Sequence, residues 1–566
     1  MIIGIDLGTT NSLVAVLRSS EVEVIPNALG EQLTPSVVGF DDEGQIIVGR
    51  IAMERLITHP DKTTASFKRL MGTSRTIQVG KKQFRPEELS ALVLRALKAD
   101  AEAYLGETVT EAIITVPAYF NDTQRKATKI AGELAGLKVE RLLNEPTAAA
   151  LAYGLHKRTE QRYLIFDLGG GTFDISIVEY FDDILEVHAS AGDNHLGGND
   201  FTEAIQHWLL KQLVAAKVTS KEAIPAPLRE RAWKKAEEAK LQLTKQNNAK
   251  IDLVWNEQRY PFTLTETEFE TIAEPLLARI TNPVRMALRD AKLRVSDLNE
   301  IVLVGGATRM PVIRKMVTKL FQRFPAMDID PDRVVAVGAA IQAALKEKSA
   351  VLNDVVMTDV CPYTLGMEIS ERQGVGYKEG FYLPIIERNS FIPVSRIKSV
   401  STLQDNQQVI VVNVYQGESP LVKDNVFLGS LTVEVPKAPA GEAIDVRFTY
   451  DVNGLLEVEV TIVSNQKKSA ITIEKNPGVL SAEEIKQRLH ELERLKIHPR
   501  DQEKNKNLVH RAQRLYQELL GDERQYVGQV LAEFMSVLEK QDDRLIREAR
   551  TQFEEVLNRF DSAERF

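Results

Sequence analysis

The feature that most constrains this sequence is a turn motif that occurs twice, each time directly after a short apolar run. The first copy is Asp6-Leu7-Gly8-Thr9-Thr10, and the second is Asp167-Leu168-Gly169-Gly170-Gly171-Thr172. A second apolar run follows each copy, Leu13–Val16 after the first and Ile175–Val178 after the second. The repetition predicts two similar halves of the chain that face a common cleft.

The chemistry of these turns suits a nucleotide with its metal ion. Glycine lacks a Cβ atom, so backbone N–H groups can approach phosphate oxygens closely, and threonine hydroxyls add donors. The carboxylates of Asp6 and Asp167 suit Mg²⁺, which keeps several waters and needs few carboxylates. One such turn alone is most often a simple hairpin, but the pair, with Gly305-Gly306 after the predicted strand Ile301–Val304, predicts a phosphate site. No Gly-x-x-x-x-Gly-Lys-Ser/Thr motif occurs, which disfavours a P-loop fold.

The pattern of apolar residues divides the chain into regions. Up to about residue 350, short apolar runs such as Tyr163–Asp167 alternate with helical stretches such as Glu87–Leu105 and Gln124–Leu137, which predicts α/β layers. From about 360 to 475, apolar and polar residues alternate, as in Ile444–Tyr450 and Leu456–Ile462. An Asn453-Gly454 turn separates these two runs and predicts an antiparallel hairpin.

The last region is helical in pattern. Ser481 and Glu484 form a capping-box pattern, and amphipathic helices are expected after it, including 501–520, 523–540 and 542–560. We therefore predict four segments: residues 1–350, a linker at 351–359, a β-rich region at 360–478, and a helical region at 479–566.

Composition excludes several classes of protein. The 566 residues carry a net charge of −9 without a basic block, so a nucleic-acid binder is not expected. The single cysteine, Cys361, permits no intrachain disulfide and suits a reducing compartment. There is no signal-peptide pattern and no apolar run long enough to span a membrane, so we expect a cytoplasmic protein.

Several segments together closely resemble the 70-kDa heat-shock chaperones of the DnaK type, and among these the bacterial HscC type. The resemblance covers nearly the whole chain and lies in residues 6–11, 116–122, 144–150, 167–174, 303–309, 405–407 and 415–418. It implies an actin-like α/β ATPase domain, a linker, an antiparallel β-sandwich that binds peptides, and a C-terminal α-helical lid. The implied function is that of an ATP-dependent chaperone, which binds and releases hydrophobic segments of unfolded proteins and hydrolyses ATP.

The resemblance also implies roles for single residues in hydrolysis. Lys68 corresponds to the lysine that orients the attacking water and the γ-phosphate, and Glu145 to a carboxylate near that water; Asp167 and Thr172 complete the catalytic set. From spacing alone, Lys68 reads as a solvated lysine and Glu145 as a residue at the start of a helix. The phosphate loops and the metal carboxylates correspond to Gly8, Thr9, Thr10, Asn11, Gly169, Gly170, Gly171 and Thr172, and to Asp6, Asp167 and Asp174, with Mg²⁺ and K⁺ as cations.

The remaining nucleotide residues correspond to two sides of an adenosine pocket. Glu237, Lys240 and Thr244 lie on the helix of one side, and Gly305, Gly306, Arg309 and Asp332 form the other side. The resemblance also assigns interdomain coupling to a set of residues that includes part of the linker, namely Pro117, Arg125, Arg141, Val355, Val356 and Asp359. The linker sequence departs from that of the family, because Met357 and Thr358 stand where leucines are usual.

The peptide pocket corresponds to apolar positions of the β-rich region, namely Met367, Val400, Leu403, Ile410 and Val412. Alternating apolar residues of a sandwich are otherwise core residues. Leu403 stands where a small arch residue is usual, and the segment between Glu368 and Asn389, which includes Arg372–Phe381, is longer than the common pattern. The arch over the peptide is therefore expected to be remodelled, and the lid is short.

The implied partners are unfolded or extended hydrophobic peptides and a J-domain co-chaperone, whereas use of the usual nucleotide exchange factor is doubtful because two exposed loops are short. These loops are Asn256–Tyr260 and Tyr180–Ile184.

Two other interpretations of the function stay open at this point. One is an ATP-binding scaffold or exchange factor without productive hydrolysis, and the other is a sugar or acetate kinase on the same core fold.

Overall fold

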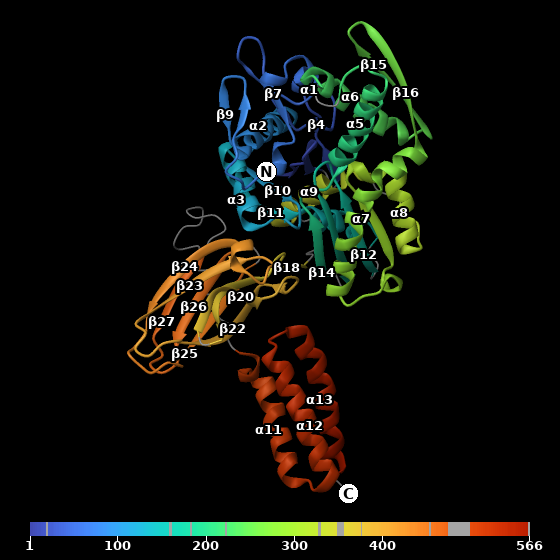
Figure 1. Cartoon of the computed structure of the whole chain (residues 1–566). Coiled ribbons are helices and arrows are strands. Elements are labelled where there is room, and N and C mark those ends of the chain that lie inside the picture. The colour runs from blue at the N-terminus through green and yellow to red at the C-terminus, as the bar shows by residue number, and fades with distance from the viewer. Residues whose placement is uncertain are drawn as a thin grey trace. The chain divides into compact units, whose positions relative to one another are not determined.

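The structure is a computed structural model that describes residues 1–18, 21–157, 161–181, 184–220, 224–326, 330–347, 356–374, 376–451, 454–473 and 498–563. The chain divides into two compact units, Met1–Tyr363 and Thr364–Phe566. The helices and strands of both units are labelled in Figure 1. Each unit is described by itself below.

The first unit contains two lobes, each built on a mixed sheet. In lobe one the strand order is β11-β10-β1-β2-β3. Strand β1 pairs in parallel with β10 and antiparallel with β2, and β10 pairs in parallel with β11. The strands are β1 (Ile2–Asp6), β2 (Asn11–Arg18), β3 (Glu21–Val24), β10 (Glu111–Val116) and β11 (Lys138–Asn144).

Lobe two repeats this arrangement. Its strands follow the order β17-β12-β13-β14-β18, with β12 parallel to β17 and antiparallel to β13. Strand β14 is antiparallel to β13 and parallel to β18. The strands are β12 (Gln161–Leu168), β13 (Phe173–Phe181), β14 (Ile184–Asp193), β17 (Glu300–Val304) and β18 (Val356–Val360). The repeated turn motif thus joins β1 to β2 in one lobe and β12 to β13 in the other.

Two helices of small residues connect the lobes. Helix α4 (Glu145–Lys157) follows β11, and α9 (Val334–Lys346) packs on β1 and on α4. Glycines allow this close approach, since a Cβ atom on Gly4 would lie 2.2 Å from the Ala340 nitrogen, and one on Gly338 would lie 1.9 Å from the Ala148 carbonyl oxygen. The start of α4 therefore stands where the two sheets come together.

The other elements of the first unit cover the sheets and build the outer parts of the lobes. They are β4 (Thr34–Pro35), β5 (Val37–Phe40), β6 (Ile46–Val48), α1 (Arg50–Thr58), η1 (Pro60–Lys62), β7 (Thr63–Ala65), η2 (Phe67–Leu70), β8 (Ile77–Val79), β9 (Lys82–Phe84), α2 (Pro86–Leu105), α3 (Asp122–Leu134), α5 (Gly198–Ala215), α6 (Ala226–Leu243), β15 (Asn248–Trp255), β16 (Gln258–Thr265), α7 (Glu266–Asp290), η3 (Val295–Asp297), η4 (Gly306–Arg309) and α8 (Pro311–Phe321). Helix α3 begins two residues before the predicted segment, because Asn121 caps it through the Gln124 amide. It ends at Leu134 rather than 137, because Gly136 adopts a φ of +74°.

The second unit contains two antiparallel sheets and a helical bundle. The sheet orders are β20-β19-β23-β24 and β22-β25-β26-β27. The strands are β19 (Leu365–Gln373), β20 (Gly376–Ile386), β21 (Phe391–Ile392), β22 (Val394–Ser401), β23 (Val409–Gln416), β24 (Val426–Glu434), β25 (Ala443–Tyr450), β26 (Leu456–Ile462) and β27 (Lys468–Ile473), with η5 (Val422–Asp424) between β23 and β24. The predicted hairpin is confirmed as β25 and β26, whose inward residues such as Val446 and Val458 are fully buried.

The residues that lengthen the segment after Glu368 extend a hairpin. Strands β19 and β20 stay paired as far as Gln373 opposite Gly376, and most side chains beyond Ile369 on both strands are exposed. Its tip includes Gly374, which has a φ of +63°. The additional length is therefore ordered β structure.

The described C-terminal helices form an antiparallel bundle (Figure 1). They are α11 (Glu503–Glu518), α12 (Gly521–Glu539) and α13 (Asp543–Ala563), preceded by η7 (Pro499–Asp501). Buried apolar residues such as Leu515, Phe534 and Leu557 form its core. This agrees with the predicted amphipathic helices, whereas the predicted capping box at Ser481 lies outside the described residues.

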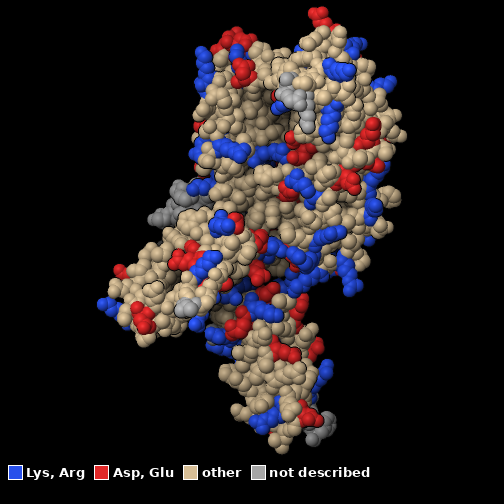
Figure 2. All heavy atoms as spheres, viewed as in Figure 1, with Lys and Arg blue, Asp and Glu red and all other residues tan. Residues whose placement is uncertain are grey.

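Acidic and basic side chains are both present on the face of each unit seen in Figure 2. Within the described ranges, no helix combines the length and apolar character needed to cross a membrane.

Candidate nucleotide site and its connection to the linker

A cavity of about 320 Å³ lies between the two lobes of the first unit. Most of the residues predicted for nucleotide and metal binding line it, namely Asp6, Gly8, Thr10, Asn11, Glu145, Asp167, Gly169, Gly170, Glu237, Lys240, Thr244, Gly305, Gly306, Arg309 and Asp332. The other predicted residues, Thr9, Lys68, Gly171, Thr172 and Asp174, are buried and do not line the cavity. The fold thus brings residues from distant parts of the chain to one site.

The two glycine-rich turns meet at the bottom of this site. A Cβ atom on Gly170 would lie 1.8 Å from the Thr10 Oγ1 atom, and one on Gly171 would lie 2.7 Å from the Thr9 Cγ2 atom. The first turn is fixed from behind, since Ser36 donates its hydroxyl to the Gly8 carbonyl at 2.8 Å. A side chain at Gly170 or Gly171 would therefore collide with a threonine side chain of the first turn.

A buried ion pair stands beside the turns. The Lys68 Nζ atom donates to the Glu145 Oε1 atom at 2.9 Å, and both residues are buried. Lys68 belongs to the short helix η2, and its ammonium also lies 5.5 Å from the centre of the Phe120 ring. Lys68 is therefore not a solvated lysine, contrary to the reading from spacing alone.

The carboxylates near this pair carry more negative charge than the single ammonium can balance. Burial, followed by the charge of Glu145, raises the pKa of Asp6 and of Asp174 to about 7. Burial also raises the pKa of Asp167 well above its ordinary value. Ionised carboxylates crowded in a buried site are costly unless a cation compensates them.

The carboxylate oxygens of this group are ligands of the kind that Mg²⁺ takes in proteins. Within the described part of the chain, no three or more His, Cys, Asp and Glu side chains form a ready metal cluster. Mg²⁺ is bound in proteins by one or two carboxylates, several waters and substrate phosphates. Carboxylates such as Asp6 and Asp167, at the ends of β1 and β12, suit that mode of binding.

The two sides of the predicted adenosine pocket are held by ion pairs. On helix α6, the Lys240 Nζ atom lies 2.8 Å from the Glu237 Oε2 atom and donates to the Gly198 carbonyl at 3.1 Å. On the opposite side, Arg309 donates to the Asp332 carboxylate at 2.7 Å. The side chains that would face a base and ribose are thus fixed by the protein.

Comparison with known proteins adds an independent observation. The profile of the family described as Hsp70 protein matches residues 2–79 and 73–564. The chain belongs to the Hsp70 family. The chaperone protein DnaK of Thermotoga neapolitana is 39% identical over 579 residues, which cover 99% of this chain and 93% of that protein. The chaperone protein DnaK of Thermosipho africanus is 43% identical over 490 residues, which cover 83% of this chain and 79% of that protein.

As a member of the Hsp70 family, this chain is an ATP-dependent chaperone with ATPase activity, and it binds nucleotide. Family membership excludes the alternative of a sugar or acetate kinase and disfavours a scaffold without hydrolysis. The predicted combination of a mixed-sheet ATPase region, antiparallel sheets and C-terminal helices is confirmed.

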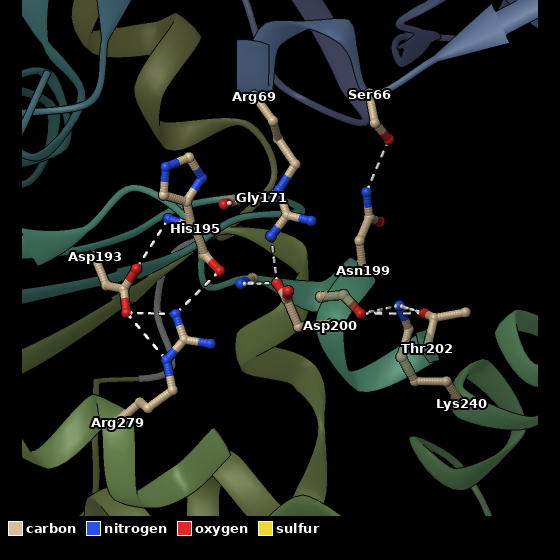
Figure 3. A network of polar contacts seen from close by, with 12 residues as sticks. Ser66, Arg69, Gly171, Asp193, His195, Asn199, Asp200, Thr202, Lys240 and Arg279 are labelled. Carbon is tan, nitrogen blue, oxygen red and sulfur yellow. Dashed lines mark hydrogen bonds and ion pairs between the residues drawn. The ribbon is translucent and has the colours of Figure 1, made fainter. Parts of the chain in front are cut away.

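Further contacts join the two lobes next to Lys68, as Figure 3 shows. Arg69 of lobe one donates to the Asp200 carboxylate at 2.5 Å, and Asn199 donates to the Ser66 hydroxyl at 2.9 Å. Asp200 also accepts from the Gly197 amide at 2.7 Å, which caps helix α5. We name these two contacts, Arg69 with Asp200 and Ser66 with Asn199, the interlobe clamp. Sequence reasoning assigned no role to any of these four residues, although Ser66 and Arg69 lie close to Lys68 in the sequence.

Three of the residues predicted for coupling, Arg125, Arg141 and Asp359, lie close to one another at the end of the linker. Within the first unit, the Asn144 side chain donates to the Asp359 carboxylate at 2.7 Å and accepts from Arg125 at 2.5 Å. Arg125 also donates to the Phe120 carbonyl at 3.0 Å. Burial lowers the pKa of Arg141, and the charge of Asp359 opposes this effect. Asn144 directly precedes Glu145, so the residue that contacts Asp359 is the sequence neighbour of the partner of Lys68.

The linker itself is partly described. Val355 lies outside the described residues, while Val356 begins strand β18, which pairs with β14 through Ile184 opposite Val356. The Thr358 hydroxyl is buried and has no hydrogen-bond partner among the described residues.

The predicted peptide-pocket positions come from both sheets of the second unit. Met367 on β19 and Val412 on β23 are buried, while Val400 on β22, Ile410 on β23 and Leu403 in the connecting loop are half-buried.

Proposed function

We propose that the interlobe cavity holds ATP or ADP with Mg²⁺, and K⁺ at neighbouring carboxylates, and that Lys68 and Glu145 carry out the hydrolytic step. The observation that carries this proposal is the buried ion pair of Lys68 and Glu145 beside two touching phosphate turns. Asp6, Asp167 and Asp174 are the carboxylates proposed for the cations. Bound Mg²⁺ supplies charge neutralisation on the phosphate oxygens.

In this proposal the protein mainly positions groups and neutralises charge, as is usual in phosphoryl transfer. The Lys68 ammonium neutralises the charge that develops on the transferred phosphoryl group. The Glu145 carboxylate orients the attacking water and accepts its proton. Backbone amides of Gly169–Thr172 and the hydroxyls of Thr9 and Thr10 hold the phosphates.

We further propose that the second unit binds extended hydrophobic segments of unfolded proteins at Met367, Val400, Leu403, Ile410 and Val412. Backbone hydrogen bonds to an extended peptide and a pocket for one aliphatic side chain would supply the affinity. A J-domain co-chaperone is the proposed partner that stimulates hydrolysis, and the cytoplasm is the proposed compartment. The assignment to the HscC type and the domain boundaries at 350, 359 and 478 stay predictions.

The test is steady-state ATP hydrolysis by the full chain, with and without a short hydrophobic peptide. Phosphate release that rises with peptide and needs Mg²⁺ is the expected result. A peptide of the same length with its aliphatic residues replaced by serine serves as the control. Hydrolysis that responds equally to both peptides would contradict the peptide-binding proposal, whereas absence of hydrolysis would contradict the proposed roles of Lys68 and Glu145.

A further inference from the structure

The junction between the two units falls between Tyr363 and Thr364. Thr364 is fixed within the second unit, because its amide donates to the Glu418 carboxylate at 2.8 Å and its carbonyl accepts from the Tyr382 hydroxyl at 2.8 Å. Tyr363 is fixed within the first unit by the contacts described next. One peptide bond therefore joins a residue held by one unit to a residue held by the other.

Tyr363 contacts one residue of lobe one through both its ring and its hydroxyl. The hydroxyl donates to the Tyr119 carbonyl at 2.8 Å, and the two rings lie with centroids 4.5 Å apart at an angle of 38°. Burial raises the pKa of Tyr363, so the phenol keeps its proton and acts as a donor. Both tyrosines are half-buried, so the hydrogen bond is partly shielded from water.

Tyr119 lies in a turn whose backbone groups are held on several sides. The Asn194 side chain donates to the same Tyr119 carbonyl at 2.7 Å, while Arg125 donates to the Ala118 carbonyl at 3.1 Å. The Tyr119 amide in turn donates to the Asp174 Oδ1 atom at 2.9 Å. The Asp174 carboxylate thus contacts the Ala118–Tyr119 peptide group, and the Tyr119 carbonyl that accepts from Tyr363 belongs to the next peptide group of the same residue.

These contacts form a continuous path from the unit junction to a proposed cation-binding carboxylate. We propose that Tyr363 is a positioning residue of the ATPase, which holds the backbone of Tyr119 at its carbonyl and, through the amide of the same residue, the Asp174 carboxylate. The path in which Asp359 contacts Asn144 reaches the same turn through Arg125, at the Ala118 and Phe120 carbonyls rather than at the Tyr119 carbonyl. The inference rests on the proposed role of Asp174 in cation binding.

The test compares Tyr363→Phe with the full-length wild-type chain. The substitution keeps the ring and removes the donated hydrogen bond, and Asn194 still donates to the carbonyl. We expect single-turnover hydrolysis to fall about 3- to 10-fold, the range that one hydrogen bond supports, with ATP affinity unchanged and more Mg²⁺ needed for half-maximal rate. Asn194→Ala removes the other donor to the same carbonyl and should shift the Mg²⁺ dependence in the same direction.

The matched control is Tyr377→Phe, which removes a hydroxyl from a tyrosine that is 55% exposed on β20 and should leave these quantities unchanged. Asp174→Asn separates the two proposals. If Asp174→Asn impairs Mg²⁺-dependent hydrolysis but Tyr363→Phe and Asn194→Ala match wild type, the inference about Tyr363 is overturned and the proposed function stands. If Asp174→Asn has wild-type Mg²⁺ dependence, the proposed role of Asp174 fails and the inference fails with it.

Discussion

At the scale of single residues, the environment of Lys68 determines what its ammonium can do. A lysine that is buried with one carboxylate and an aromatic face has lost most of its hydration, so its charge acts strongly on any group brought near it. Removal of one partner of such a pair leaves the other charge buried and unpaired, which is destabilising. Effects on turnover must therefore be separated from effects on folding.

The substitution Lys68→Ala should abolish hydrolysis and leave ATP binding near normal. Loss of one charge-stabilising group in a buried site typically lowers the rate about 10²- to 10³-fold. Single-turnover hydrolysis and equilibrium ATP binding measure the two effects separately. Lys211→Ala, at an exposed position on α5, is the control, and wild-type turnover in Lys68→Ala would remove Lys68 from the mechanism.

A second residue-scale prediction concerns the peptide pocket. Ile410→Phe should weaken binding of a labelled hydrophobic peptide at least about tenfold, because a larger ring fills a pocket sized for an aliphatic side chain. Val411→Phe is the matched control, since Val411 is 51% exposed and neighbouring strand residues point to opposite faces. Equal peptide affinity in both variants would locate the pocket elsewhere.

At the scale of elements, the interlobe clamp connects a short helix to a phosphate loop. Helix η2 presents Lys68 to the site, and Ser66 and Arg69 on either side of it contact residues at the start of α5. The α5 amides of Gly198 and Asn199 donate to the Gly169 and Gly170 carbonyls at 2.9 Å each. One set of contacts therefore joins the helix that carries Lys68 to the turn at Gly169 and Gly170 in the other lobe.

The clamp predicts a change in nucleotide release. Asn199→Ala removes a donor across the cleft, and Ser66→Gly removes its acceptor while glycine readily adopts the Ser66 φ of 58°. Each variant should release ADP about 2- to 10-fold faster, and the double variant should match the single variants because one hydrogen bond is lost in all three. Stopped-flow release of a fluorescent ADP analogue measures this, and additive effects would show that the two residues act independently.

The linker strand gives a second prediction at this scale. Thr358→Val removes a buried hydroxyl that lacks a partner among the described residues and keeps the side-chain shape, so pairing of β18 with β14 should become stronger. Hydrogen exchange of the amides of Val356–Val360 should slow by about tenfold. Thr358→Ser, which keeps the hydroxyl, is the control; faster exchange in Thr358→Val would show that the hydroxyl is satisfied in solution.

At the scale of the whole molecule, the length of the exposed loops of lobe two leads to a prediction about the rate of nucleotide exchange. Strands β15 and β16 pair up to Trp255 opposite Gln258, so the turn between them consists of Asn256 and Glu257 alone. The predicted strand 262–264 is thus only part of β16, and the hairpin is longer and its turn shorter than expected. A short turn offers little surface for an exchange factor and few contacts that close the cleft.

We therefore expect intrinsically fast ADP release that the usual bacterial exchange factor does not accelerate. Hydrolysis rather than ADP release should then limit the basal cycle, because fewer contacts must break when the lobes open. The rate at which a fluorescent ADP analogue is released, measured with and without the exchange factor, tests this expectation. Slow release with many-fold acceleration by the factor would refute this expectation.

The sequence by itself determined the parts of this protein that depend on local pattern. The repeated glycine-rich turns predicted two parts of the chain that meet at one cleft, and the turns do meet there, since a Cβ atom at Gly170 would collide with the Thr10 hydroxyl. Alternation in Ile444–Tyr450 and Leu456–Ile462 predicted the paired strands β25 and β26, because a sheet with one buried face has a period of two.

The tertiary structure decided which distant residues meet. Lys68 and Glu145 carry no local signal for their pairing, and neither do Ser66 and Asn199 or Tyr363 and Tyr119, since each pair is separated by many residues along the chain. Their contacts result from the packing of two lobes around shared helices, and burial then fixes each polar group on a partner. Turns and strands can be predicted from residues that are close in the sequence. The burial and the pairing of a charged side chain depend instead on how the whole unit packs.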